Sequence, residues 1–103
     1  MDFSQMQDML SQASAMRESM EEKLSQTVVE ASSGGGAVEA RMNGRKELLK
    51  LTITPAAASA AAGDITMLED LIVAAVNEAG RKADEVAQAS AGDMLGGLGL
   101  PDF

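Results

Sequence analysis

Apolar residues recur at intervals of three and four along the C-terminal half of this chain of 103 residues. They form one helical face made of Leu68, Leu71, Ile72, Ala75, Val76, Ala79, Ala83 and Val86. This spacing predicts a long amphipathic helix. Asp64 and Thr66-Met67-Leu68-Glu69 are competing N-terminal caps, and Gly92 is expected to end the helix after about Ala91. So long a stripe is hard to bury within one small chain, so the pattern favours an assembly.

A second periodic stripe runs along the first 24 residues. Ser4-Gln5-Met6-Gln7 has the form of a helix-starting capping box. The apolar positions then step by three and four residues, through Met6, Met9, Ala13, Met16, Met20 and Leu24. We interpret them as a heptad-like helix seam that ends near residue 24. A peptide-binding groove is the alternative, because methionine adapts its shape to different partners.

Three strands are expected between the helices, at about residues 26–33, 36–42 and 45–54. The glycines Gly34-Gly35-Gly36 make the first turn permissive. The dipeptide Asn43-Gly44 is a strong signal for a two-residue hairpin turn.

The hairpin turn sets a predicted register between the second and third strands. Arg41 would lie opposite Lys46, and Val38 opposite Leu49, which separates an apolar face from a polar one. Pro55 ends the third strand. The alanine-rich residues 56–63 then form a short helix or a linker.

Element lengths indicate the architecture of this α+β chain, in which a three-stranded antiparallel sheet separates two long helices. The helices would span about 30 and 39 Å at ~1.5 Å per residue, but a seven-residue strand only about 23 Å. Both helices must therefore overhang the sheet, and we expect an obligate dimer. Residues 1–92 form a single domain, and 93–103 a flexible, glycine-rich apolar tail. The residues expected in the dimer interface or core seam are Met6, Met9, Met16, Met20, Leu68, Leu71, Ile72 and Val76.

Composition excludes most catalytic chemistry. The chain has no histidine and no cysteine, which removes disulfides, thiolate nucleophiles, Ser-His triads and nearly every zinc site. We therefore expect no enzyme, no metal and no cofactor. No signal peptide or membrane-length apolar span is found, so a soluble, cytoplasmic protein without a membrane or small-molecule partner is expected.

The net charge of −8 argues against a protein that coats DNA generically. Only residues 41–50 are locally positive, with four cations against the single acid Glu47. A phosphate or an acidic partner would relieve the repulsion between opposed cations there, whereas a solvated strand face is the simpler alternative. The candidate DNA-binding residues are Arg41, Arg45, Lys46 and Lys50 in this region, with Arg17, Lys23, Arg81 and Lys82 on the helices.

Two further patterns have simpler explanations. The triple glycine lacks the helix and lysine that a phosphate-binding loop requires, so it is interpreted as a turn. Five carboxylates of the last helix could in principle hold a divalent cation, but a solvated helix surface explains them better: Glu69, Asp70, Glu78, Asp84 and Glu85.

Four features in order resemble one bacterial family. They are the Met- and Gln-rich first helix, the Asn43-Gly44 hairpin, the block from Met67 to Ala79 and the ending Gly96-Gly97-Leu98-Gly99-Leu100-Pro101. The chain is similar in these to the YbaB/EbfC family of nucleoid-associated proteins. The resemblance implies an intertwined homodimer with projecting helical arms that binds duplex DNA in the nucleoid and acts in nucleoid organisation and gene expression.

Two functional hypotheses stay open. The first is a nucleoid protein that binds DNA mainly through phosphates. The second is an acidic, dimeric adaptor for recombination or replication proteins, without DNA affinity of its own.

Overall fold

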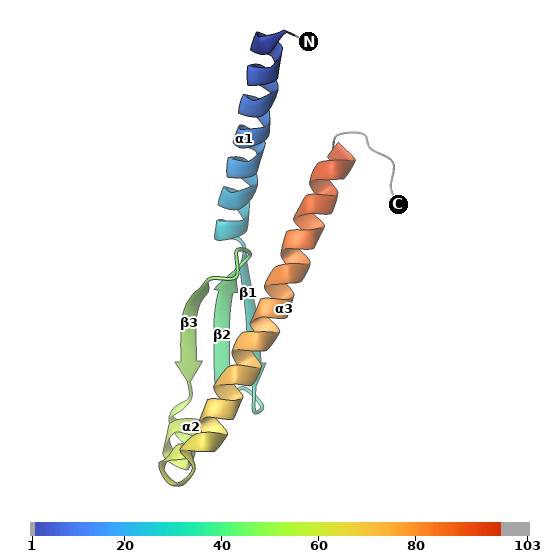
Figure 1. Ribbon diagram of the computed structural model, residues 1–103. Coiled ribbons are helices and arrows are strands. Elements are labelled where there is room, and N and C mark those ends of the chain that lie inside the picture. Colours follow the sequence, from blue (N-terminus) through green and yellow to red (C-terminus); the bar gives the residue numbers. More distant parts are fainter. Residues whose placement is uncertain (1, 98–103) are drawn as a thin grey trace.

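The computed structural model describes the backbone of residues 2–97 and the side chains of residues 2–92. The elements follow the predicted order of helix, three strands and helix (Figure 1). They are α1 (Phe3–Gln26), β1 (Val28–Ser33), β2 (Val38–Asn43), β3 (Leu48–Ile53), α2 (Pro55–Ala60), the 3-10 turn η1 (Ala61–Gly63) and α3 (Ile65–Gly97). The predicted α+β class is confirmed, and the alanine-rich stretch is helical rather than a linker.

The helix ends differ from three sequence predictions. Asp2 precedes α1 without a side-chain cap, so the capping box at Ser4 is wrong. At α3, Asp64 Oδ1 accepts a hydrogen bond from the Met67 amide at 3.2 Å, so Asp64 is the cap and the box at Thr66 is not used. Helix α3 continues through Gly92 to Gly97. Gly92 does not adopt the positive φ that ends many helices.

The long helix therefore takes in the start of the predicted tail. Residues 93–97 belong to α3, and residues 98–103 lie outside the described residues.

The core lies between α3 and the face of β1 and β2. The sheet is antiparallel in the order β1-β2-β3, and α3 crosses it diagonally over β1 and β2 (Figure 1). Its centre consists of Ala31, Val38, Ala40, Met42, Ala75, Ala79 and Ala83. The three alanines of α3 let the helix approach the sheet closely. Leu68, Leu71, Ile72 and Val76 are partly buried and pack around this centre.

The first turn is as expected, but the predicted register of the second hairpin is wrong. Gly34-Gly35-Gly36 all have positive φ and connect β1 to β2. Arg41 lies opposite Lys50 rather than Lys46, and Val38 lies opposite Ile53 rather than Leu49. A bulge interrupts the ladder after Arg41. The shift at these pairs is an even number of residues, so the apolar and polar faces are still separated as predicted.

The physical reason for this shift is a longer loop, residues 44–47. Asn43 ends β2 and is buried, and its Oδ1 accepts hydrogen bonds from the amides of Arg45 and Glu47, each at 3.0 Å. Its Nδ2 donates to Glu47 Oε1 at 2.9 Å. The left-handed residue of the loop is Lys46, with φ of 66°.

Gly44 joins the same loop to the end of α1. Its amide lies 2.9 Å from the carbonyl oxygen of Leu24 and 3.0 Å from that of Thr27. A Cβ atom at Gly44 would lie 2.9 Å from the Leu24 oxygen, so glycine permits this approach. The Leu24 carbonyl also accepts from the Thr27 amide at 3.2 Å, so Gly44 adds a second donor at the end of the helix.

Beyond this junction α1 leaves the body of the protein. Leu24 is its only buried residue, and both α1 and α3 extend past the sheet, as the element lengths predict (Figure 1). The molecule measures 69 × 27 × 18 Å, with a radius of gyration of 19.7 Å. A compact chain of this length has a radius of about 13 Å. Neither helix, within the described residues, has the length of apolar sequence that would cross a bilayer.

Candidate nucleic-acid interface

Four of the eight candidate cations already have partners within the chain. Arg41 Nη2 lies 2.6 Å from Glu30 Oε1, and its Nε donates to the same oxygen at 2.9 Å. These two residues are paired across β1 and β2. Since Ala40 points into the core, Arg41 lies on the sheet face away from α3.

The other three paired cations involve α3. Lys46 Nζ lies 3.1 Å from Asp84 Oδ2, and its stem passes over Gly80. Arg81 is paired with Glu78 one turn earlier on the same helix. Lys82 Nζ donates to the backbone carbonyl of Glu30 at 2.8 Å, which covers part of the open edge of β1.

The remaining four cations are Arg17, Lys23, Arg45 and Lys50. Their side chains form no ion pair or hydrogen bond with any residue that the structure describes. All four are exposed. They are carried by α1, by the loop 44–47 and by β3, and none lies on α3.

Lys23 and Arg45 both flank a backbone contact at the base of α1. Lys23 precedes Leu24, Arg45 follows Gly44, and the Gly44 amide donates to the Leu24 carbonyl at 2.9 Å. Arg17 lies six residues further out on α1, a rise of about 9 Å. We call Arg17, Lys23 and Arg45 the arm-base cations.

Lys50 completes a row across the outer face of the sheet. Glu30, Arg41 and Lys50 are successive cross-strand neighbours on β1, β2 and β3. The like charges that face each other are thus Arg41 and Lys50. The predicted register had placed Lys46 opposite Arg41. Glu30 neutralises one of them and leaves the Lys50 ammonium in excess.

The acidic partners of Arg41 and Lys46 were not predicted, because they come from other elements of the fold. Glu30 is 11 residues from Arg41, and Asp84 approaches Lys46 only because α3 packs beside the loop. The role of Asn43 in the loop was also missed. Its signal was present, since Asn and Asp side chains commonly hydrogen-bond nearby backbone in turns.

A continuous apolar stripe lies on the same helix as two of the unpaired cations. The exposed fractions are 72% for Phe3, 48% for Met6, 57% for Met9 and 68% for Leu10. Met16 is also exposed and Met20 is half-buried. On the sheet, Leu48 and Leu49 of β3 are about half exposed. Isolated apolar residues are common on surfaces, but a contiguous stripe of this length marks an interaction site.

The carboxylates of α3 do not converge. Among the residues that the structure describes, no three carboxylates are grouped so as to hold a metal ion. Glu78 and Asp84 are instead engaged with Arg81 and Lys46.

Comparison with known proteins identifies relatives of this chain. Residues 1–98 match the model of the YbaB/EbfC DNA-binding family. A nucleoid-associated protein of Acidobacterium capsulatum is 64% identical over 99 residues, covering 93% of this chain and 92% of the relative. One of Koribacter versatilis is 44% identical over 96 residues, covering 93% of each chain. The crystal structure of an uncharacterized protein from Helicobacter pylori superposes with a TM-score of 0.76 at 29% identity, covering 92% of this chain and 98% of the other.

Proposed function

Because the chain belongs to the YbaB/EbfC DNA-binding family, we propose that it binds duplex DNA as a homodimer, through phosphate contacts made by its unpaired cations. By these contacts it organises the nucleoid and influences gene expression. The observation that carries the proposal is that only four of the eight candidate cations are paired within the residues that the structure describes. Arg17, Lys23, Arg45 and Lys50 are exposed and unpaired in the described part of a chain whose net charge is −8.

Electrostatics supports phosphate contacts rather than base recognition. A cation that already has a carboxylate partner gives up that partner when it binds phosphate, whereas an unpaired cation gains the full interaction. The arm-base cations lie near the point where α1 extends beyond the sheet. A duplex lying along α1 would therefore be within their reach. No tryptophan or tyrosine is present to stack on bases.

The apolar stripe on α1 supports the homodimer. In a single chain, Met6, Met9 and Leu10 are exposed although they follow helical spacing. A second copy carries the same stripe, and a two-fold interface joins identical patches. Closing two stripes together would hold two sets of arm-base cations in one particle.

The dimer can be tested with one substitution and a matched control. Met9→Glu places a charge in the stripe, whereas Ser11→Glu places the same charge on the opposite side of α1. Sedimentation equilibrium should give about twice the chain mass of 10.6 kDa for the parent and for Ser11→Glu. Met9→Glu should give the single-chain mass with its helical circular dichroism retained. Equal masses for both variants would contradict this interface.

DNA binding is tested by fluorescence anisotropy of a labelled duplex between 50 and 200 mM salt. The double variant Lys23→Gln/Arg45→Gln should reduce the slope of log K against log salt by about 1.8 per chain that binds, since each phosphate contact contributes ~0.9. Arg41→Gln/Arg81→Gln removes the same total charge from paired positions and should leave the slope close to that of the parent. Equal loss in both variants would refute the assignment to the unpaired cations.

The parent alone also discriminates between the two functional hypotheses. If it fails to bind duplex DNA even at low salt, where attraction is least screened, the adaptor hypothesis replaces this proposal.

A further inference from the structure

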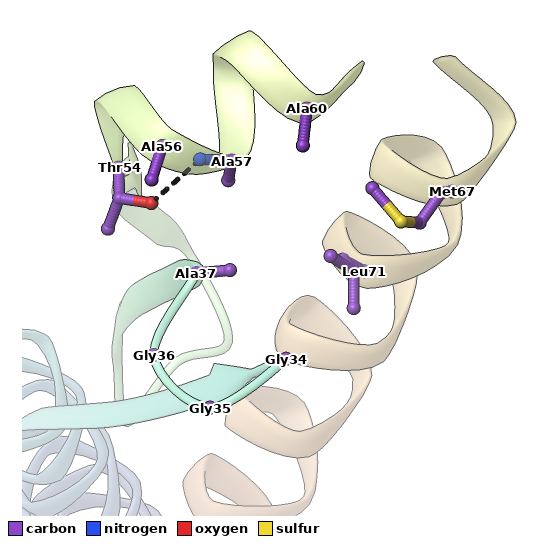
Figure 2. A pocket seen from close by; sticks show the side chains of 10 residues that line it. All are labelled: Gly34, Gly35, Gly36, Ala37, Thr54, Ala56, Ala57, Ala60, Met67 and Leu71. Atoms are coloured by element: carbon purple, nitrogen blue, oxygen red, sulfur yellow. Dashed lines mark hydrogen bonds between the residues drawn. The ribbon is translucent and has the colours of Figure 1, made fainter. Parts of the chain in front are cut away.

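An open apolar pocket lies at the end of the molecule opposite the projecting part of α1. It has a volume of about 620 Å³ and lies between the turn Gly34–Ala37, helix α2 and the first two turns of α3 (Figure 2). This volume is within the range of about 300–1,000 Å³ found for clefts that bind small ligands, although the pocket is broadly open to solvent. Nothing proposed above uses this pocket.

Small residues create the pocket. Ala57 and Ala60 of α2 face Met67 and Leu71 across it (Figure 2), and methyl groups are too short to fill the space between the two helices. The hydroxyl of Thr54 is engaged, because it accepts a hydrogen bond from the Ala57 amide at 3.2 Å. The lining carries no charged side chain. The pocket therefore suits an uncharged, apolar occupant.

The chain itself supplies a segment that is apolar apart from Asp102. Residues 98–103, which lie beyond the described part, read Leu-Gly-Leu-Pro-Asp-Phe and include one of only two aromatic residues of the chain. The leucines and Phe103 of this segment supply the large apolar side chains for which the glycines and alanines of the lining leave space.

The segment cannot reach the pocket of its own chain. From Leu71 to Gly97, helix α3 rises about 39 Å at ~1.5 Å per residue. Six residues span at most about 21 Å when fully extended. Figure 1 shows that the end of α3 and helix α2 lie at opposite ends of the long molecule. An occupant from this chain must therefore come from another copy.

We propose that the tail residues 98–103 of one copy bind in the pocket between α2 and α3 of another copy. The contact joins two different surfaces, so it is head-to-tail and can repeat along a string of copies. It is separate from the self-complementary stripe on α1, so it would connect dimers to one another. An array of dimers could then bridge distant duplexes.

Full-length chains test this directly. Ala60→Glu places a charge in the pocket mouth, and Ala58→Glu is its control, on the same helix but outside the lining. The tail variant Leu98→Ser/Leu100→Ser leaves the described body untouched. Sedimentation velocity is measured over increasing protein concentration. The parent and Ala58→Glu should form species that sediment faster than the one seen at the lowest concentration. Ala60→Glu and the tail variant should not.

A labelled peptide of residues 97–103 identifies the occupant. Its anisotropy should rise when full-length parent protein is added, and Ala60→Glu should weaken the binding at least fivefold. If Ala60→Glu stops growth but the parent does not bind the peptide, the pocket receives the body of another copy and the proposal for the tail is overturned. Growth that is equal in all four proteins overturns it as well. Duplex binding at low protein concentration should be unchanged in Ala60→Glu, so this outcome is independent of the proposed DNA contacts.

Discussion

The loop after β2 depends on one buried amide side chain, and Asn43→Ala removes it. Asn43 is 4% exposed and makes three side-chain hydrogen bonds. Two are accepted by Oδ1 from the amides of Arg45 and Glu47 at 3.0 Å, and one is donated by Nδ2 to the Glu47 carboxylate at 2.9 Å. Alanine can form none of these three hydrogen bonds.

The expected loss of stability follows from these contacts. A typical hydrogen bond contributes about 0.5–1.5 kcal/mol net, and a buried group left without a partner costs more. Arg45 and Glu47 are exposed, so water can replace part of what is lost. We therefore expect the free energy of unfolding to fall by about 2 kcal/mol, in the lower part of the range of about 1.5–4.5 kcal/mol for three bonds.

Urea unfolding followed by circular dichroism at one protein concentration measures this loss. With a slope of about 1–3 kcal/mol/M for a small protein, the midpoint should fall by about 1 M and the slope should not change. Asn77→Ala is the matched control, because Asn77 is exposed on α3 and its side chain makes no hydrogen bond within the described residues. A loss below about 0.5 kcal/mol for Asn43→Ala, similar to that expected for a surface substitution, would refute the role given to this amide.

Three other substitutions test the local geometry. Gly44→Ala forces a Cβ to within 2.9 Å of the Leu24 carbonyl and should cost about 1–3 kcal/mol in urea unfolding; an unchanged midpoint would show that the contact is dispensable. Gly92→Ala meets nothing within 4 Å and should gain about 0.5–1 kcal/mol of helix stability, seen as amide exchange in the last turns of α3 slowed about two- to fivefold; faster exchange would contradict a helical Gly92. Thr54→Val removes the hydroxyl that caps α2 and should lower the free energy of unfolding by about 1 kcal/mol, whereas Ser59→Ala on the exposed side of α2 should not.

The sequence was sufficient for the elements and their faces, because periodicity is a local property. The stripe through Leu68, Ile72 and Ala79 requires a helix whatever lies beside it, and the alternation around Val38 and Ala40 requires a strand. The overhang of both helices also followed from lengths alone.

The register and the ion pairs could not be predicted in this way. Asn43-Gly44 is a correct signal for a turn, but its residues serve a longer loop, in which the Asn43 side chain bonds the backbone of Arg45 and Glu47 and the Gly44 amide donates to the end of α1. Similarly, Arg41 and Lys46 look unpaired in sequence, yet acids from β1 and α3 neutralise them in space. Such contacts depend on tertiary packing, which no short window of sequence contains.

Helix α1 is attached to the loop at Gly44 only near its C-terminal end, so a small rotation there moves its far end by a large distance. Its 24 residues extend about 36 Å, yet in a single chain only the turn around Leu24 is buried against the body. A rotation of 10° about that point would move the tip by about 6 Å, on the order of the width of a minor groove. Small changes at the loop would therefore be amplified into large displacements of the apolar stripe near the tip. The loop around Gly44, rather than the length of α1, would then decide how the stripes of two copies can be aligned.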